Sequence, residues 1–376
     1  MHVLILGTRG VPAKHGGFET FAQDLALYLK NRGHQVTVYC QIESGDELGE
    51  DAWRGIRRIL IPAKQTPFGT IAFDFAANWH SCHEKGVILT LGYNTGIFSF
   101  LYRFRHIPSV MNMDGIEWKR KKWTLLQRGW LRINEWTAAR AANHLVADNP
   151  EIVRHLLRHT SPGKISMIPY GATPVLAAPV RLIQRYGLNP KNYYILVARP
   201  EPENSILEIV RAYSLKRRGI PLVVLGSYVP KSNRYHRAVM YAAGPEVKFL
   251  GSVYDGDLVK ALRFHAKAYL HGHTVGGTNP SLVEALAAGN AVIARDNRFN
   301  RWVAGQGARY FTGSDDLAEI IDLLESEPSS LRIMEAESRK RHVEAFTQDK
   351  ILSAYEELLL QFAHARDFSS CDVGTV

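Results

Sequence analysis

Short apolar runs alternate with helical patterns along this chain, and they do so in two separate series. The first series has apolar runs at residues 3–6, 36–39, 59–61, 87–89, 109–111 and 144–146. The second has apolar runs at residues 194–197, 222–225, 247–250, 268–270 and 291–293. Parallel strands need long crossover connections, which are usually helices, so this order predicts two parallel sheets with helices on both faces. We therefore expect an α/β fold of two Rossmann-like, doubly wound domains.

The length of 376 residues also favours two domains, because single hydrophobic cores rarely grow beyond about 250 to 300 residues. We predict an N-terminal domain over 1–171, a linker rich in alanine and proline over 172–191, and a C-terminal domain over 192–345. The last segment, 346–376, is expected to form a helix that packs back toward the N-terminal domain, followed by a tail. Open α/β sheets bind ligands beyond the carboxyl ends of their strands, so we expect the two domains to face each other across a ligand-binding cleft.

Composition restricts the compartment and the partners. The three cysteines, Cys40, Cys82 and Cys371, lie far apart and form neither a CxxC pattern nor a disulfide framework. No run of about 18 apolar residues and no signal-peptide pattern is present, so we expect a cytoplasmic protein without a membrane span. The net charge of +10 fits an anionic membrane surface, phosphorylated small molecules or nucleic acid, and does not choose among them.

A glycine-rich loop follows the first apolar run and opens into a helical pattern; it reads GTRGVPAKHGGFET over residues 7–20. Glycines let backbone N–H groups approach a phosphate or sugar at the positive end of a helix. The glycine spacing differs from GxGxxG and the loop is long, which disfavours a dehydrogenase. We expect Gly16 and Gly17 to contact that phosphate or sugar. The candidates for substrate contacts are Arg9, Lys14, His15 and Glu19. The alternative is a surface loop with turn glycines.

Two carboxylates follow the apolar run at 109–111, in the stretch MNMDGIEW over 111–118. A carboxylate at a strand's carboxyl end can accept a proton from an acceptor hydroxyl, so Asp114 is a catalytic candidate and Glu117 a substrate-binding candidate. The alternative is an ordinary Asp-Gly turn with Glu117 at the start of a helix. Asp114 is preferred because it lies nearest the end of the strand.

A basic and aromatic stretch comes next, with KRKKW over 119–123 and a helical pattern that contains Arg128, Trp130, Arg132 and Trp136. Cations interleaved with tryptophans suit an anionic membrane surface or the phosphates of a lipid-linked substrate. A solvated basic face over a buried aromatic stripe would give the same pattern, and so would a site for single-stranded nucleic acid. We favour the membrane or lipid partner and expect no nucleic acid.

In the second half, two motifs end strands and begin helices. Arg199, in VARPEPEN over 197–204, is placed to hold a diphosphate and to stabilise the leaving group. The stretch HGHTVGGTNPSLVEALAAG over 271–289 joins a strand to a helix whose start offers N–H groups to a diphosphate. Glu284, one turn into that helix, could accept hydrogen bonds from ribose hydroxyls. The candidate donor-binding residues are Arg199, Gly277, Thr278, Asn279, Ser281 and Glu284. The alternative is a capped helix with a buried glutamate.

No metal is expected in this site. His271 and His273 alternate at a strand end but lack a third ligand nearby in sequence, so we keep His273 only as a substrate contact. The triplet Asp255-Gly256-Asp257 resembles a DxD metal motif, yet an amphipathic helical pattern follows it directly. Helix capping by Asp255 is the better interpretation.

With these motifs in place, the chain resembles the retaining glycosyltransferases of family 4 over nearly its full length, most specifically in NPSLVEA over 279–285. The loops at 7–20 and 114–119 more narrowly resemble bacterial rhamnosyltransferases of capsule and exopolysaccharide assembly. The resemblance implies a GT-B fold, a hexosyltransferase, a dTDP-rhamnose donor and an undecaprenyl-diphosphate-linked saccharide acceptor. It also implies retention by front-face attack, with Asp114, Arg199 and Glu284 as catalytic residues and no cofactor.

Two positions depart from the wider family. Its first glutamate, eight residues before Glu284, is Gly276 here, and its diphosphate-binding lysine falls on Asn204. Arg199 would therefore carry more of the phosphate charge. The alternatives are a transferase with another donor (UDP-glucose, UDP-galactose or GDP-mannose), a nucleotide-sugar epimerase, and a non-catalytic nucleotide-sugar-binding subunit. We expect peripheral association with the inner face of the plasma membrane.

Overall fold

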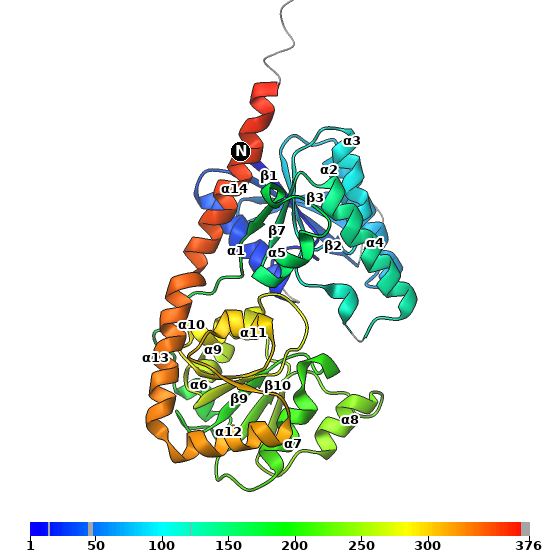
Figure 1. The fold of residues 1–376 in the computed structure, drawn as a ribbon. Helices are drawn as coiled ribbons and strands as arrows, with labels where there is room; N and C mark the ends of the chain where they lie inside the picture. The colour runs from blue at the N-terminus through cyan, green and yellow to red at the C-terminus, as the bar shows by residue number, and fades with distance from the viewer. Residues whose placement is uncertain (14–15, 44–47, 121, 370–376) are drawn as a thin grey trace, which may run out of the picture. The chain divides into compact units, whose positions relative to one another are not determined.

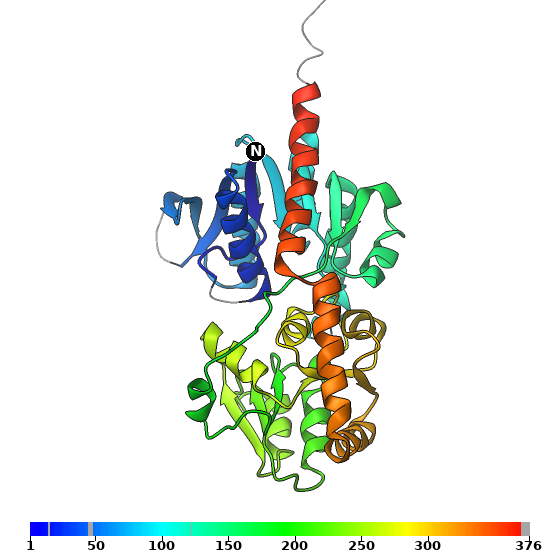
Figure 2. The same ribbon diagram turned by 90° about the vertical axis from the view of Figure 1, so that its left-hand side faces the viewer.

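The computed structural model describes residues 1–369 apart from 14–15, 44–47 and 121, with side chains described up to 363. The chain divides into two compact units (Figure 1). Unit 1 comprises Met1–Lys119, Trp123–Pro169 and the C-terminal segment from Ile351, and unit 2 comprises Arg120–Lys122 and Tyr170–Lys350. Each unit is an α/β layer structure with its own sheet, as the two views in Figures 1 and 2 show.

Unit 1 contains an eight-stranded sheet in the order β3-β4-β2-β1-β5-β6-β7-β8. Its strands are β1 (His2–Leu6), β2 (Gln35–Ile42), β3 (Gly49–Trp53), β4 (Ile56–Pro62), β5 (Val87–Leu91), β6 (Ser109–Asn112), β7 (His144–Ala147) and β8 (Ile165–Met167). Its α-helices are α1 (Gly17–Asn31), α2 (Pro67–Ser81), α3 (Phe100–Phe104), α4 (Leu125–Ala141) and α5 (Pro150–Leu156). Single 3-10 turns lie at η1 (Gly96–Ser99), η2 (Glu117–Lys119) and η3 (Pro162–Lys164).

One pairing in this sheet differs from the predicted all-parallel order. β3 pairs with β4 in antiparallel fashion, with Trp53 opposite Ile56. The two connecting residues, Arg54 and Gly55, both have positive φ, at 49° and 78°. This is the geometry of a two-residue hairpin, whose backbone twist matches that of the strands. The hairpin adds an antiparallel edge strand to an otherwise parallel sheet.

Unit 2 contains a six-stranded parallel sheet in the order β11-β10-β9-β12-β13-β14. Its strands are β9 (Tyr194–Val197), β10 (Leu222–Leu225), β11 (Val247–Gly251), β12 (Ala268–His271), β13 (Ala291–Arg295) and β14 (Arg309–Phe311). Its helices are α6 (Arg181–Gln184), α7 (Ile206–Ser214), α8 (Arg234–Tyr241), α9 (Gly256–Phe264), α10 (Pro280–Ala287), α11 (Arg298–Ala304), α12 (Ser314–Ser326) and α13 (Pro328–Ala345), with the turn η4 (Pro202–Asn204).

Both faces of the unit 2 sheet are buried. Ile195, Val223 and Tyr269 belong to the core cluster on one face, together with α9 and α10. Tyr194, Leu196 and other alternate strand residues belong to a second cluster with α7 and α12. A sheet covered on both sides needs apolar side chains at successive positions, which explains why these strands are continuous apolar runs.

The last helix, α14 (Gln348–Ser369), starts in unit 2 and packs within unit 1 from Ile351 onward. Its Glu356, with a side chain 6% exposed, accepts hydrogen bonds from Tyr28, Arg32 and His34 around the end of α1. The Tyr355 hydroxyl accepts a hydrogen bond of 2.6 Å from the Asn112 amide at the end of β6. None of the helices described is both long enough and apolar enough to cross a membrane.

Candidate active site

In unit 2, the loop after β9 carries Arg199 at the carboxyl edge of the sheet. Arg199 is exposed, whereas Asn204 is 5% exposed and donates from its side-chain amide to the Arg199 carbonyl at 2.7 Å. Asn204, which stands where the wider family has a diphosphate-binding lysine, therefore closes the loop. Arg199 is the cation that this loop presents to solvent.

The loop after β9 is locked against the loop after β12. A Cβ atom on Gly272 would lie 2.0 Å from the Asn204 carbonyl oxygen, so only glycine fits there. Both the N–H and the hydroxyl of Thr274 donate to the Glu203 carbonyl, each at 2.9 Å. Since the two loops leave adjacent strands of one parallel sheet, their backbones form one fixed edge.

Three aromatic rings form a ladder at the end of β12. The His271 ring stacks on His273, with centroids 4.4 Å apart and planes 11° apart, and lies 5.9 Å from the Tyr269 ring. Burial lowers the pKa of His271 to about 3. Burial, followed by the neighbouring His271, also holds the pKa of His273 well below its ordinary value. Both imidazoles are therefore neutral near pH 7 and can donate or accept a hydrogen bond without adding charge.

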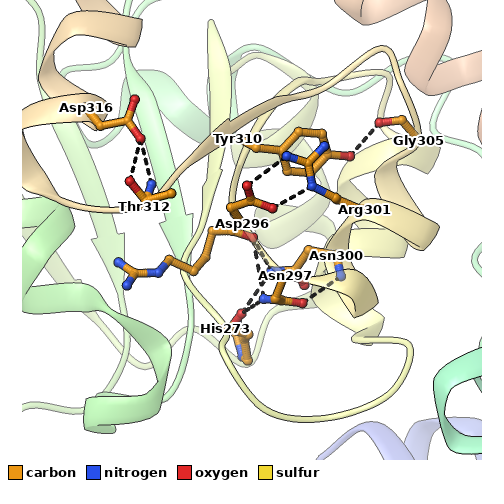
Figure 3. A network of polar contacts seen from close by, with 10 residues as sticks. His273, Asp296, Asn297, Asn300, Arg301, Gly305, Tyr310, Thr312 and Asp316 are labelled. Atoms are coloured by element: carbon orange, nitrogen blue, oxygen red, sulfur yellow. Dashed lines mark hydrogen bonds and ion pairs between the residues drawn. The ribbon is translucent and has the colours of Figure 1, made fainter.

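Two asparagines hold the backbone of His273 in place (Figure 3). The side-chain amides of Asn297 and Asn300 each donate to the His273 carbonyl at 2.9 Å. Asn297 is also the N-cap of α11, and Asn300 reaches the Arg295 carbonyl at 2.9 Å. The end of β13 thus fixes the direction in which the β12 loop leaves the sheet.

Helix α10 begins at Pro280, as predicted, and Asn279 is its N-cap. The Asn279 side chain accepts the Ser281 N–H at 3.0 Å, and its carbonyl accepts the N–H groups of the next two residues. These N–H groups are already paired, contrary to the expectation that this helix start offers free donors. The Ser281 hydroxyl is also engaged, at 2.7 Å from the Tyr269 hydroxyl and 3.1 Å from the Val197 carbonyl. Thr278 is 2% exposed.

Glu284 lies on α10 beside Arg263 of α9. Their nearest atoms are 2.6 Å apart, and the Glu284 side chain is 43% exposed while that of Arg263 is 6% exposed. The ion pair fixes the carboxylate and leaves part of it facing solvent. Eight residues earlier, Gly276 has φ of 138°, and nothing lies within 4 Å of a Cβ atom placed there. A side chain at 276 would have space but a strained backbone. Gly277 lies half-buried in the same loop.

In unit 1, the loop after β1 follows the carboxyl edge of the sheet. Gly10 approaches the backbone and side chain of Cys40 so closely that a Cβ atom would lie 2.5 Å from its sulfur. The Arg9 guanidinium donates to Gln65 at 3.1 Å, and the Arg9 N–H lies 3.4 Å from the Glu19 carboxylate. Gly16, the N-cap of α1, and Gly17, its first residue, are exposed. The predicted contacts Lys14 and His15 lie outside the described residues.

Asp114 follows β6 in a left-handed turn, with φ of 45°. Its N–H donates to the Asn112 side chain at 2.8 Å, and the Met113 N–H donates to the Val146 carbonyl at 2.8 Å. Aspartate adopts the left-handed conformation more readily than most residues. Asp114 can therefore form an ordinary Asp-Gly turn and still act as a site residue. Asp114 is half-buried at the sheet edge, and the nearby Glu117 N–H donates to the Tyr93 hydroxyl at 2.8 Å.

Sequence reasoning missed three side chains that shape this site: Arg263, Asn297 and Asn300. Each shapes the site through a partner distant in sequence, Arg263 through Glu284 and the two asparagines through His273, so no local pattern reveals these contacts. The predicted role of Asp255 as a helix cap is confirmed, because its side chain caps α9 by accepting the N–H groups of Asp257 and Leu258.

Two family models match the chain in succession. Residues 1–173 match DUF1972, a domain of unknown function, and residues 181–341 match the glycosyl transferases group 1. No curated protein matches the sequence.

Solved structures share the fold over almost the whole chain. Sucrose-phosphate synthase from Thermosynechococcus elongatus superposes with a TM-score of 0.80 at 17% identity, over 97% of this chain and 99% of that one. The Anabaena protein HepE in complex with UDP gives 0.74 at 17% identity, over 96% and 100%. WaaG, a glycosyltransferase involved in lipopolysaccharide biosynthesis, gives 0.73 at 15% identity, over 96% and 99%.

The fold is therefore GT-B, with two α/β parallel-sheet domains and C-terminal helices. Residues 181–341 form a domain of the glycosyl transferases group 1, so the protein is a glycosyltransferase, and residues 1–173 form a DUF1972 domain. The predicted fold class and the predicted transferase class are confirmed.

Proposed function

We propose that this enzyme transfers a hexose, rhamnose from dTDP-rhamnose being the first choice, to a lipid-diphosphate-linked saccharide with retention of configuration. The observation that carries the donor half of the proposal is the exposed Arg199 on a loop closed by Asn204 and packed against the β12 loop. A guanidinium carried on a rigid loop can bind a diphosphate in bidentate fashion and stabilise it as it leaves. The neighbouring Thr274 and Gly276 belong to the loop that would surround it.

Glu284 is the candidate for the ribose. The ion pair with Arg263 holds its carboxylate in one direction, so the group is positioned before the nucleotide binds. The proposed anion contacts come from Arg199 and from the backbone of Gly276 and Gly277, since the first N–H groups of α10 are already paired. HepE has been solved with UDP-glucose, which makes UDP-sugars the second donor class to test.

Gly276 stands where the wider family has a glutamate that contacts the donor sugar, which favours a donor sugar that is bound in another way. The position has open space but a backbone that disfavours any side chain, so no carboxylate reaches the sugar from there. A deoxy sugar offers one hydroxyl fewer for such a carboxylate to bind, which is in keeping with a rhamnosyl donor. In unit 1, Asp114 is the candidate that orients the acceptor hydroxyl, in a turn set by Asn112.

The acceptor and the membrane surface are proposed from large apolar side chains that three helices of unit 1 expose. Helices α2, α3 and α4 expose large apolar side chains: Phe68, Phe75, Trp79, Phe104, Leu125, Leu126, Trp130, Ile133 and Trp136. We call this set the apolar face of α2–α4. These elements pack together, as Figure 1 shows, and Trp136 carries the Arg140 guanidinium 4.4 Å from its ring. Aromatic and aliphatic groups beside arginines fit the interface of an anionic bilayer.

The transfer is tested with a donor panel. Purified enzyme is incubated with dTDP-rhamnose, UDP-glucose, UDP-galactose, UDP-N-acetylglucosamine or GDP-mannose, each with and without a membrane lipid extract, and release of nucleoside diphosphate is measured. We expect release from one donor, dependent on the extract. Release from UDP-glucose alone would identify glucose, and not rhamnose, as the transferred sugar. No release of nucleoside diphosphate with any donor would contradict the proposal.

The membrane surface is tested separately by sedimentation with vesicles of phosphatidylglycerol and phosphatidylcholine. Leu125 and Leu126 are 85% and 87% exposed, so the double substitution to aspartate should leave the fold intact and weaken binding to anionic vesicles. Leu215→Asp is the matched control, because Leu215 is 63% exposed and lies outside the apolar face of α2–α4. Equal binding by all three proteins would remove this face from the proposal.

A further inference from the structure

Three side chains of unit 1 that no step of the proposed reaction uses converge beneath Trp118. They are Glu135 of α4, His155 of α5 and His159 of the turn after α5, and each offers a metal-ligating atom within 4.8 Å of the other two. The Glu135 Oε1 atom lies 2.7 Å from Nε2 of His155 and 3.6 Å from Nε2 of His159. The rings of the two histidines lie with their centroids 5.6 Å apart, in an edge-on arrangement.

We propose that Glu135, His155 and His159 form a binding site for a divalent transition metal, with Zn²⁺ as the best fit. Two imidazole nitrogens and one carboxylate oxygen are the ligand set that Zn²⁺ accepts when a fourth position stays open to water. Mg²⁺ and Ca²⁺ prefer oxygen ligands and suit this set poorly. The site goes beyond glycosyl transfer and does not depend on it.

The distances match what such a metal requires. Ligands about 2.0 to 2.1 Å from a tetrahedral Zn²⁺ lie about 3.3 Å from one another. The Glu135–histidine separations of 2.7 and 3.6 Å bracket this value, and the third pair, His155 and His159, lies within 4.8 Å and would close toward it around the ion. The metal would replace the proton that the carboxylate and His155 now share in their hydrogen bond.

The surroundings also have the form of a built site. The Glu135 side chain is 5% exposed, and its other oxygen, Oε2, accepts the Trp118 indole N–H at 2.9 Å. An outer hydrogen bond of this kind orients a metal-binding carboxylate and leaves one oxygen for the metal. The His159 side chain is 29% exposed, which gives the ion a route of entry. The nearby cations Lys119 and Arg132 contact the ring of Trp118 and are not paired with the carboxylate.

The test uses full-length protein freed of any histidine tag and treated with chelator. ZnCl₂ is titrated calorimetrically, and Co²⁺ is added in parallel because its visible absorption reports nitrogen ligation. We expect one saturable site, lost in His155→Asn and in His159→Asn. His83→Asn is the matched control, since His83 lies on the surface of the same unit outside the cluster. Trp118→Phe should weaken binding by about 10- to 100-fold, as loss of an outer hydrogen bond does.

Several outcomes would overturn the proposal. Absence of saturable Zn²⁺ binding by the wild-type protein would leave Glu135 and His155 as a hydrogen-bonded pair and nothing more. Binding that survives both histidine substitutions would place the ion elsewhere. If His155→Asn fails to fold, His159→Asn decides alone, because its side chain is partly exposed and its contact with Glu135 is the longer one.

Discussion

The stacked histidines at the end of β12 make the stability of unit 2 depend on pH in a defined direction. His271 is fully buried and its pKa is lowered to about 3, against about 6.5 for an unfolded histidine. Because the pKa is lower in the folded state, the unfolded state binds the proton first as pH falls. The contribution of His271 to the stability of unit 2 is therefore complete above the pKa of the unfolded state and is lost as pH falls toward the pKa of the folded state. A pH of about 5 lies about 1.5 units below the pKa of the unfolded histidine. Protonation of the unfolded state therefore lowers the free energy of unfolding by about 2 kcal/mol.

His271→Gln removes this titration, so the difference in stability between about pH 8 and pH 5 should shrink by about 2 kcal/mol relative to wild type. Because a two-unit protein need not unfold in one step, the assay follows unit 2 alone. Urea unfolding is monitored by pulsed hydrogen exchange and mass spectrometry of a peptide that contains Ala268–His271. His83→Gln, at a surface histidine, should keep the wild-type difference. If His271→Gln keeps it too, the lowered pKa of His271 is refuted.

Three further predictions concern single positions. Gly272→Ala places a methyl group 2.0 Å from the Asn204 carbonyl, so it should destabilise unit 2 by about 1 to 3 kcal/mol and weaken nucleotide binding. Urea unfolding measures the first effect and calorimetry the second. An unchanged affinity would show that the contact between the loops after β9 and β12 does not shape the nucleotide site. Asp114→Asn should lower kcat while leaving donor affinity within about twofold, and unchanged turnover would remove Asp114 from the site. Arg263→Met should raise the Kd for the nucleotide diphosphate by freeing Glu284, and an unaltered Kd would show that this ion pair does not position the ribose contact.

Much of the fold follows from the order of apolar runs, because strands buried on both faces must be apolar throughout. The start of α10 at Pro280 and the cap of α9 at Asp255 were predicted correctly, since capping depends on neighbouring residues. The helical pattern expected after the basic stretch begins at Leu125, where Thr124 and Gln127 form a capping box. Local chemistry therefore sets boundaries well wherever a cap is present.

Other features could not be read from the sequence because they depend on tertiary partners. The β3–β4 hairpin turns on Arg54 and Gly55, and arginine is not a residue that marks a left-handed turn. The pairing of Glu284 with Arg263 joins two helices, so no spacing rule finds it. The convergence of His155 and His159 on a glutamate twenty residues away likewise requires the packing of α5 against its neighbours.

The most direct test of the central claim is the movement of the sugar itself. Enzyme is incubated with donor labelled in the sugar, a lipid-diphosphate-linked saccharide is added, and label is counted in the organic-extractable lipid. We predict that wild-type enzyme moves label into the lipid and that Arg199→Ala, which removes the exposed cation, reduces the rate by about 100-fold or more. Equal transfer by wild type and Arg199→Ala would contradict the assigned donor site, and no transfer from any labelled nucleotide sugar would contradict the proposed reaction.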